Sequence, residues 1–297
     1  MRTNRVPPQA YFVGSAVFHY LGPAFAVLLF PSVGPLGAAW LRIASAAAIF
    51  AGWRRPWRSS GAAAARWTVV GLGVVLAVMN TVFYLAIARL PLATVGAIEF
   101  LGPVALAAYG LRPGKNCAAK RHDQGGGWVT GGRNLAALVL AVAGVVLLTD
   151  VRLTAEPFGM AMAFANCALF VLYVVLGKRI ASSGAGIDRL GLSMLVAAVA
   201  VTPLGLADAV PAFDTPRLLG AGLAVGVCSS VLPYVLDQLA LARLSRAGFA
   251  LMLSLLPATA TIIGLLVLRQ VPEPAELAGI ALVIAGVAIH HDREEHA

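Results

Sequence analysis

Ten long apolar segments, separated by short polar stretches, dominate the chain. A helix that crosses the hydrocarbon core of a bilayer needs about 20 residues, and the segments are close to that length. They lack the alternation of polar and apolar residues that a transmembrane strand needs, and they are too long for one. The sequence therefore predicts an all-α integral membrane protein with ten transmembrane helices, over residues 11–30, 34–53, 67–88, 92–111, 134–149, 157–177, 188–207, 217–240, 247–268 and 274–290.

The composition excludes the main alternatives to a membrane protein. Hydrophobic residues make up 60% of the 297 residues, and charged residues make up 12%, about half of the roughly 25% found in an ordinary globular domain. A soluble domain needs more polar side chains than this to cover its surface, and a disordered chain is far less apolar. The three cysteines form no CxxC pair, so we expect no disulfide framework, no metal site and no cofactor.

Basic residues predict the orientation in the membrane. The net charge is +9, but the charges lie in short clusters between apolar segments, so we expect no nucleic-acid partner. Of the 22 Lys and Arg residues, 17 lie in the loops of one side, four lie in the loops of the other, and Arg42 lies inside a segment. Because basic loops stay in the cytoplasm, both termini are predicted to be cytoplasmic. The first segment also resembles a signal peptide, but its apolar run is long enough to span a bilayer.

The two halves of the chain resemble each other. A shift of 154 residues places Arg89 and Pro103 on Arg243 and Pro257, and a shift of 142 residues aligns the later parts. The shifts differ because loop 112–133 lengthens the first half; its glycines and basic residues indicate a flexible cytoplasmic linker. We predict two repeats, residues 1–150 and 151–297. Each has five predicted helices, an odd number, so the second repeat is expected to be inverted, as in many secondary transporters.

Four polar residues on four different segments lie at a similar depth. Arg42 and Glu99 are roughly 12 Å from the outer surface, and Asn80 and Asn166 are roughly 13 Å from it, at 1.5 Å per residue. Ionisable groups at such a depth are costly and mark functional sites. The shared depth predicts a substrate site. An ion pair between Arg42 and Glu99, and interhelical hydrogen bonds from the two asparagines, are structural alternatives that are compatible with a site.

Further polar residues extend this prediction. Tyr84 lies one turn from Asn80, and Tyr234 lies three residues before Asp237, so each pair shares a helix face. Asp237 lies near the cytoplasmic end of its segment, where it is either a proton carrier, a snorkelling group or part of a local pair. His19 lies in the middle of the first segment, where a single histidine is more typical of packing than of proton transfer.

Four prolines interrupt predicted transmembrane helices. Each removes a backbone donor and loosens or kinks its helix. We interpret them as bends that allow the helices to gate a cavity, with inert packing kinks as the alternative. These residues are Pro23, Pro103, Pro233 and Pro257.

Several motifs keep a fixed order along nearly the whole chain: Phe30-Pro31-Ser32-Val33-Gly34, Leu41-Arg42, Pro56-Trp57-Arg58, Phe83-Tyr84-Leu85, Pro91-Leu92, Glu99-Phe100-Leu101-Gly102-Pro103, Leu232-Pro233-Tyr234 and Leu239-Ala240-Leu241-Ala242-Arg243-Leu244. In these motifs the chain resembles the bacterial threonine/homoserine exporters of the drug/metabolite transporter superfamily (EamA type). The resemblance implies two inverted five-helix repeats and efflux of amino acids or similar small metabolites. It also implies functional positions at Glu99, Asn80, Tyr84 and Asp237.

The second half departs from the family pattern. Leu256-Pro257 stands where the family commonly has Glu-Pro, and Arg269-Gln270 stands where it commonly has Gly-Glu. These differences indicate a different substrate, or proton coupling that relies on Glu99 and Asp237 alone. A structural or assembly partner with a decayed site is a further alternative.

The functional prediction is a multi-pass secondary transporter of the cytoplasmic (inner) membrane that exports threonine- or homoserine-like amino acids by alternating access. Glu99 and Asp237 are the candidate proton carriers, because burial disfavours the charged form of a carboxylate. A broad drug or metabolite exporter is one alternative. An intramembrane lipid-modifying enzyme is another, although the chain has no HExxH or GxSxG motif. The residues expected to contact substrate are Glu99, Arg42, Asn80, Tyr84, Asn166 and Tyr234. The sequence leaves the exact substrate, the coupling ion and the oligomeric state open.

Overall fold

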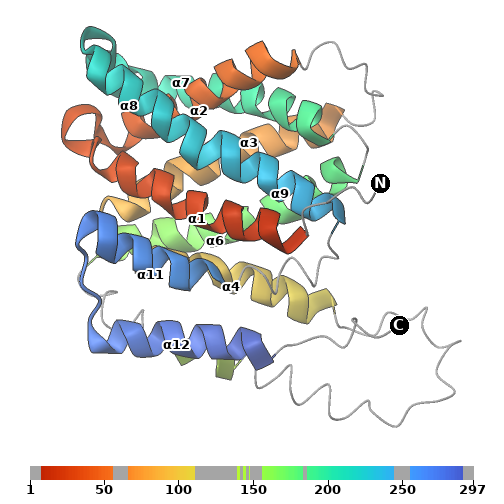
Figure 1. The fold of residues 1–297 in the computed structure, drawn as a ribbon, viewed down its shortest axis with the longest axis vertical. Coiled ribbons are helices and arrows are strands. Elements are labelled where there is room, and N and C mark those ends of the chain that lie inside the picture. Colours follow the sequence, from red (N-terminus) through yellow and green to blue (C-terminus); the bar gives the residue numbers. More distant parts are fainter. Residues whose placement is uncertain are drawn as a thin grey trace, which may run out of the picture.

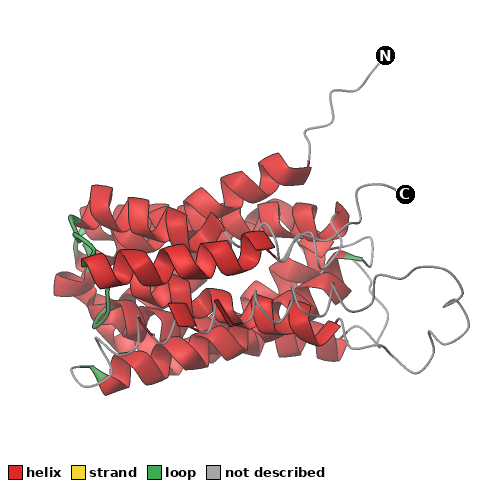
Figure 2. Cartoon of the chain, turned by 90° about the horizontal axis from the view of Figure 1, so that it is seen from below, coloured by secondary structure: helices red, strands yellow, loops and turns green. Residues whose placement is uncertain are grey.

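A computed structural model describes residues 8–55, 66–110, 139–140, 143–144, 147, 156–182, 186–243 and 255–289. Within these residues every regular element is a helix (Figure 2). The elements are α1 (Pro8–Val27), α2 (Phe30–Arg54), α3 (Arg66–Ile87), α4 (Leu92–Gly110), α6 (Pro157–Ala181), α7 (Gly186–Asp214), α8 (Pro216–Gly226), the π-helix η4 (Val227–Val231), α9 (Leu232–Arg243), α11 (Leu255–Leu268) and α12 (Pro274–Ile289).

These helices lie on the predicted apolar segments, with most ends within a few residues of the prediction. The clearest difference is α7, which continues to Asp214, seven residues beyond its predicted segment. The predicted segment 134–149 lies almost entirely outside the described residues, as does the first part of 247–268. In the part of the chain that the structure describes, five helical stretches are long and apolar enough to cross a membrane: Phe30–Arg54, Arg66–Ile87, Pro157–Ala181, Gly186–Asp214 and Pro216–Ala240. The ten-helix count stays a prediction.

The helices form a bundle in which elements from the two halves of the chain alternate (Figure 1). α8, η4 and α9 follow one another as a single rod across the bundle, and α12 lies at one edge, beside α11 and α4. α2 packs most extensively on α7, and α3 packs on α6 and α7. α1 packs on α9 and α11, whereas α4 packs on α6 and α11. Contacts between the halves therefore hold most of the described bundle together.

The packing pairs follow a simple exchange rule. Exchanging α1 with α6, α2 with α7, α3 with the α8–η4–α9 rod, and α4 with α11 converts most of the extensive pairs into observed pairs. The smaller α6·α9 and α3·α4 contacts have no counterpart of similar extent. The α1·α9 contact becomes α6·α3, the α1·α11 contact becomes α6·α4, and the α2·α8 contact becomes α7·α3. The α2·α7 and α4·α11 contacts map onto themselves. This is the pattern that two structurally equivalent halves related by a two-fold axis would give.

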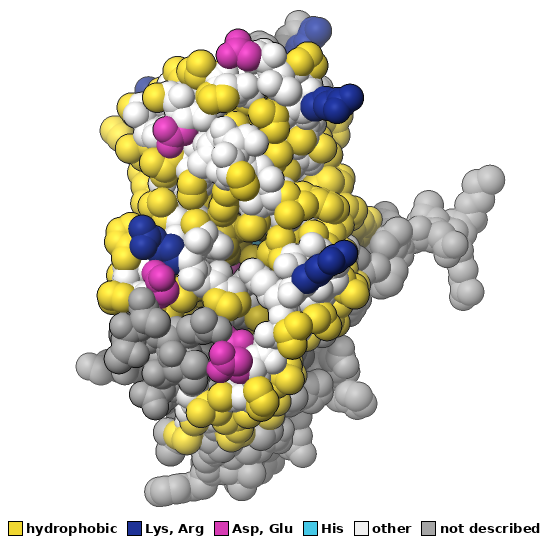
Figure 3. Space-filling model, turned by 90° about the vertical axis from the view of Figure 1, so that its left-hand side faces the viewer, with side chains coloured by type: hydrophobic (Ala, Val, Ile, Leu, Met, Phe, Trp, Pro, Cys, Tyr) yellow, Lys and Arg dark blue, Asp and Glu magenta, His cyan; other side chains and the backbone are white. Residues whose placement is uncertain are grey.

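Large apolar side chains remain exposed on the outside of the bundle. Val199 on α7, Leu172 on α6 and Val74 on α3 are each more than 45% exposed. Figure 3 looks along the helices onto the end of the bundle where α7 meets α8, and there charged side chains are scattered among hydrophobic ones. Exposed apolar surface of this extent marks contact with lipid or another protein, and on apolar helices of spanning length it fits a lipid bilayer.

A break in α2 lies at Gly34, where φ is 63° and ψ is 171°. Backbone angles of this kind are accessible essentially to glycine alone. The predicted segment 34–53 corresponds to the helix after this break, and Phe30–Val33 form a separate turn before it. Among the four predicted gating prolines, Pro23 lies within α1, Pro103 within α4, Pro233 directly after η4, and Pro257 near the beginning of α11. Their gating role stays a prediction.

Helices α2 and α7 come into close contact at glycines. A Cβ atom on Gly37 would lie 2.8 Å from the backbone carbonyl carbon of Asp208, and a Cβ on Gly205 would collide with the backbone at Leu36. Backbone atoms cannot move aside as the end of a side chain can. Small residues at such positions let membrane helices pack closely.

We therefore expect Gly37→Ala to lower the stability of the folded protein, by about 1–3 kcal/mol, because it overpacks this contact. Gly52→Ala, later in the same helix, is the matched control, since a Cβ there would meet no atom within 4 Å. Alanine favours helix over glycine by up to about 1 kcal/mol, so the control is expected to be neutral or stabilising. Thermal unfolding of both purified variants in one detergent measures the difference; equal midpoints would contradict the close packing.

Candidate functional site

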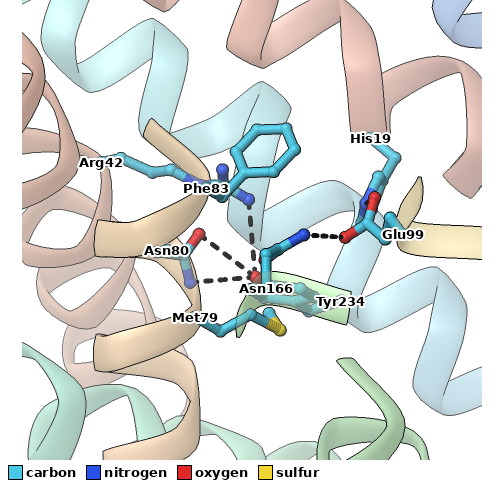
Figure 4. A pocket seen from close by; sticks show the side chains of 8 residues that line it. All are labelled: His19, Arg42, Met79, Asn80, Phe83, Glu99, Asn166 and Tyr234. Carbon is cyan, nitrogen blue, oxygen red and sulfur yellow. Dashed lines mark hydrogen bonds and ion pairs between the residues drawn. The ribbon is translucent and has the colours of Figure 1, made fainter. Parts of the chain in front are cut away.

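A buried cavity lies among side chains from six helices (Figure 4). Each lining side chain is at most 7% exposed. The cavity brings together the four polar residues that the sequence placed at one depth, and adds Tyr234 from the same prediction. The lining residues are His19 from α1, Arg42 from α2, Met79, Asn80 and Phe83 from α3, Glu99 from α4, Asn166 from α6 and Tyr234 from α9.

The Glu99 carboxylate lies at one end of the cavity and has three neighbours. The Tyr20 hydroxyl donates to Oε2 at 3.0 Å, and the Asn166 amide nitrogen donates to Oε1 at 3.0 Å. His19 Nε2 lies 3.6 Å from Oε2. Because the Asn166 amide nitrogen faces the carboxylate, its Oδ1 points elsewhere, and this fully buried oxygen has no hydrogen-bond partner among the described residues.

The Arg42 guanidinium lies at the other end and is held by the α8–η4–α9 rod. Its Nε donates to Ser230 Oγ at 2.8 Å, and Nη2 donates to the Ser229 carbonyl at 2.6 Å and to the Tyr234 hydroxyl at 3.4 Å. The rings of Tyr84 and Tyr234 lie 5.5 Å and 5.9 Å from its central carbon. Among the described residues nothing accepts a hydrogen bond from Nη1, so two donors of Arg42 are available to a ligand.

The ion pair between Arg42 and Glu99, allowed as a structural alternative by the sequence, is not formed. Arg42 has no carboxylate partner among the described residues, and Glu99 instead faces His19. The π-helix explains the difference, because the Ser229 carbonyl and the Ser230 hydroxyl on η4 take up Nε and Nη2. The cavity therefore presents a positive and a negative group at separate ends (Figure 4).

Asn80 and Tyr234 form a hydrogen-bonded group with Arg42 at its end of the cavity. The Asn80 amide nitrogen donates to the Leu76 carbonyl at 2.7 Å and to the Tyr234 hydroxyl at 3.2 Å. That hydroxyl also accepts from Arg42. Tyr84, by contrast, lies beside Arg42 with a buried hydroxyl that makes no hydrogen bond with the described residues. Tyr234 thus joins α2, α3 and α9 at the cavity.

The different hydrogen bonding of the Tyr234 and Tyr84 hydroxyls predicts that replacing each tyrosine with phenylalanine changes the stability by different amounts. Tyr234→Phe removes a hydroxyl shared by Arg42 and Asn80, and we expect it to lower the free energy of unfolding by about 1–3 kcal/mol. Tyr84→Phe removes a hydroxyl without a protein partner and is expected to be nearly neutral. Thermal unfolding of both variants without substrate tests this, and an equal loss of stability would contradict the network.

Asp237 lies in a second polar cluster next to the cavity. Its carboxylate accepts from Ser15 Oγ at 2.5 Å and from the Tyr173 hydroxyl at 2.8 Å. It is only 4% exposed, so it does not snorkel, and its hydrogen-bond partners come from α1 and α6 rather than from its own helix. The Tyr173 ring packs against Tyr234, with ring centres 5.4 Å apart. Ser15 lies one turn before His19 on α1, so α1 contacts both buried carboxylates.

Sequence reasoning missed part of the site. It treated His19 as a packing residue and assigned no role to Tyr20, Ser229 or Ser230, although all four surround Glu99 or Arg42. Two adjacent serines in an apolar segment were a weak signal, but nothing in the sequence marks a π-helix. Among the described residues no cluster of His, Cys, Asp and Glu is arranged to hold a metal ion.

The residues that replace the family's second-half glutamates have packing roles. Leu256 is buried in the apolar core. Gln270 Oε1 accepts a hydrogen bond from the backbone nitrogen of Leu92 at 3.1 Å, which caps the beginning of α4. Arg269 provides the turn before it, with φ at 55°. Neither Leu256 nor Gln270 lines the cavity around Glu99.

Comparison with known proteins agrees with these observations. The model of the EamA-like transporter family matches residues 157–290. The threonine/homoserine exporter RhtA of Escherichia coli K12 is 32% identical over 271 residues, which cover 89% of this chain and 84% of RhtA. The chain belongs to the EamA-like transporter family. It is therefore a multi-pass membrane transporter and not an enzyme.

Other relatives extend the comparison. RhtA of Salmonella typhimurium SL1344 is 32% identical over the same shares of both chains. The uncharacterized transporter YwfM of Bacillus subtilis 168 is 27% identical over 229 residues, 75% of this EamA-like chain and 73% of YwfM. A crystal structure of a protein 19% identical in sequence superimposes with a TM-score of 0.55 and covers 96% of this chain and 98% of its own. That likeness concerns the fold alone.

Proposed function

We propose that this EamA-like transporter exports threonine- or homoserine-like amino acids across the cytoplasmic membrane, in exchange for protons. The observation that carries the proposal is the charge arrangement of the cavity, with Arg42 at one end and Glu99 at the other. The names of the RhtA relatives, threonine/homoserine exporters, support the substrate class.

An amino acid fits this arrangement because it carries one positive and one negative group. The substrate carboxylate would bind Arg42 Nη1, whose donors have no partner among the described residues. Charge-assisted hydrogen bonds of this kind are among the strongest in proteins. The substrate ammonium would bind Glu99. With both ends paired, the occupied cavity holds no uncompensated charge from the substrate, which matters at membrane depth.

A substrate hydroxyl has a candidate partner in Asn166. Its Oδ1 is fully buried and unpaired, and its amide nitrogen is fixed on Glu99. A buried acceptor without a partner costs about 1–3 kcal/mol, so a bound hydroxyl would relieve that cost. Threonine and homoserine both carry a hydroxyl beyond the amino and carboxylate groups. Asn80, Tyr84 and Tyr234 would orient the substrate next to Arg42.

The cavity is closed around its polar side chains. Its volume is only about 10 Å³, about the smallest space that holds one water molecule. Its side chains are almost completely buried, so a substrate enters only when the surrounding helices separate. This supports alternating access, with Pro23, Pro103, Pro233 and Pro257 as bending points.

The inverted repeat belongs to the same proposal. The exchange rule among the helix pairs supports two equivalent halves, and the cavity takes side chains from both of them. In secondary transporters built from inverted repeats, the substrate site lies near the bilayer midplane between the repeats. Lys and Arg are much more frequent in the loops of one side than in those of the other, which supports cytoplasmic termini. In this arrangement the loop 112–133 is also cytoplasmic.

Efflux of radiolabelled threonine and homoserine from loaded cells tests the proposal. Cells that express the protein are expected to lose label faster than cells with an empty vector, and a protonophore is expected to abolish the difference. If the protein is in the membrane and efflux matches the vector, amino-acid export is wrong. Accelerated efflux of drug-like cations instead would favour the broad exporter.

A further inference from the structure

His19 is a buried basic group whose position the proposed function has not used. Its Nε2 lies 3.6 Å from Glu99 Oε2, and the side chain lines the cavity. Its ring is held edge-on by Tyr20 and by Phe170, with ring centres 5.2 Å and 6.0 Å away. The imidazole is therefore fixed beside the carboxylate that would receive the substrate ammonium.

Among the described residues, Glu99 has no other basic neighbour that could neutralise it. Its remaining neighbours are Tyr20 and Asn166, which are neutral hydrogen-bond donors, and Arg42 is bound to η4. Histidine is the side chain that changes its charge between about pH 5 and pH 8. Protonated His19 and a substrate ammonium would both bind the Glu99 carboxylate. A second cation at this depth in the membrane is strongly unfavourable.

Other titratable groups surround His19 on the helices packed near it. The described part of α11 contributes none, and the charged residue of α8, Arg217, lies at the beginning of that helix. Asp237 is the second carboxylate in this region, and it is already bonded to Ser15 and Tyr173. Away from the helix ends, the titratable side chains on the described parts of these helices are Glu99 from α4, Arg42 from α2, Asp237 and Tyr234 from α9, Cys167 and Tyr173 from α6, Cys228 from η4, and Tyr20 from α1.

We propose that His19 and the substrate ammonium compete for Glu99, so that binding of one substrate expels one proton from His19; this rests on the proposed function. In the empty cavity the imidazolium of His19 neutralises Glu99. When the ammonium takes its place, the Nε2–H bond breaks, the electron pair stays on nitrogen, and the proton passes to water and leaves. Glu99 faces one positive charge before and after the exchange.

This competition also gives transport its direction. Where the outer side is more acidic than the cytoplasm, a cavity open to the outside exchanges its substrate for a proton on His19. In a cavity open to the cytoplasm the lower proton concentration favours the reverse exchange, and Glu99 binds a new substrate. The same residue thus links substrate release outside to proton entry.

Isothermal titration of the purified full-length protein with L-threonine, from about pH 5 to about pH 8, tests the proposal. In the wild type we expect the affinity to rise by up to about tenfold per pH unit on the acidic side and then to level off. Titrations in two buffers of different ionisation enthalpy are expected to show about one proton released per threonine at acidic pH. His19→Gln is expected to bind tightly at all these pH values, without proton release.

His19→Lys keeps a positive charge beside Glu99 throughout this range, so we expect weak threonine binding at every pH. The expected results for His19→Gln and His19→Lys are opposite. Either variant that folds therefore tests whether His19 competes with the substrate for Glu99. Glu273→Gln, at an exposed carboxylate outside the cavity, is expected to keep the pH dependence of the wild type. A pH dependence that persists in His19→Gln, or disappears in Glu273→Gln, would overturn the role of His19 while leaving amino-acid transport intact. Absence of threonine binding to the wild type would instead remove the proposed function, and this inference with it.

Discussion

Glu99→Gln is expected to reduce threonine efflux to the level of the empty vector while the protein still inserts in the membrane. Glutamine keeps the shape and one acceptor oxygen, for either Tyr20 or Asn166, but it removes the negative charge that would bind the substrate ammonium. Loss of one partner of a buried charge pair costs about 2–5 kcal/mol, which corresponds to a 30-fold to several-thousand-fold loss of affinity. Efflux of labelled threonine, normalised to the amount of protein in the membrane, measures the effect.

Glu273→Gln is the matched control for this prediction. It makes the same chemical change at an exposed carboxylate in the loop before α12, outside the cavity. We expect its efflux to be close to that of the wild type. Wild-type efflux by Glu99→Gln would refute the assignment of the ammonium site, and an equal loss in both variants would point to a general effect of the net charge.

Arg42→Lys is expected to weaken threonine binding by about 10- to 150-fold, although the positive charge is kept. Hydrogen bonds to charged groups contribute about 1.5–3 kcal/mol. Arginine uses Nε and Nη2 to hold η4 and Tyr234, and it still has Nη1 for a ligand. A lysine ammonium is a compact charge that cannot reach both sets of partners. Titration of purified protein with threonine gives the change in dissociation constant.

Threoninol, the amino alcohol that lacks the carboxylate, separates the possible causes. Its binding is expected to differ little between the wild type and Arg42→Lys, because the lost contact involves the carboxylate. Arg54→Lys is the matched control, since Arg54 pairs with Asp188 at 2.7 Å near the ends of α2 and α7, outside the cavity. A proportional loss of threoninol binding would show that Arg42 supports the cavity rather than the substrate.

Much of the fold could be predicted from the sequence, because the bilayer imposes one requirement on every segment. Each spanning helix must be apolar over about 20 residues, so its position can be read directly from the hydropathy. The helix ends were less certain, and the break at Gly34 depends on backbone angles that hydropathy does not record. The similarity between the halves is visible as matching positions, but which helices pack together is settled by shape, as at Gly37 against Asp208.

The candidate site was predicted in part. Counting residues from the ends of the segments brought Arg42, Asn80, Glu99 and Asn166 to one depth, because the rise of a helix is constant. The depth of a residue in the membrane does not give the rotation of its helix about the helix axis. It could therefore not show which charged side chains face each other. The sequence therefore allowed a pair between Arg42 and Glu99, whereas the structure places His19 at Glu99 and η4 at Arg42.

The sequence by itself determined the class of the protein, the position of most helices and the polar residues buried among them, since these follow from the cost of polar groups in lipid. The tertiary structure alone decided the partners of those residues. A π-helix shifts the register of hydrogen bonds in the α8–η4–α9 rod, and this turns the Ser229 carbonyl and Ser230 toward Arg42. Packing of α1 against α9 and α11 brings His19 to Glu99 and Ser15 to Asp237. Such contacts depend on helix rotation and close packing, which no single segment of sequence contains.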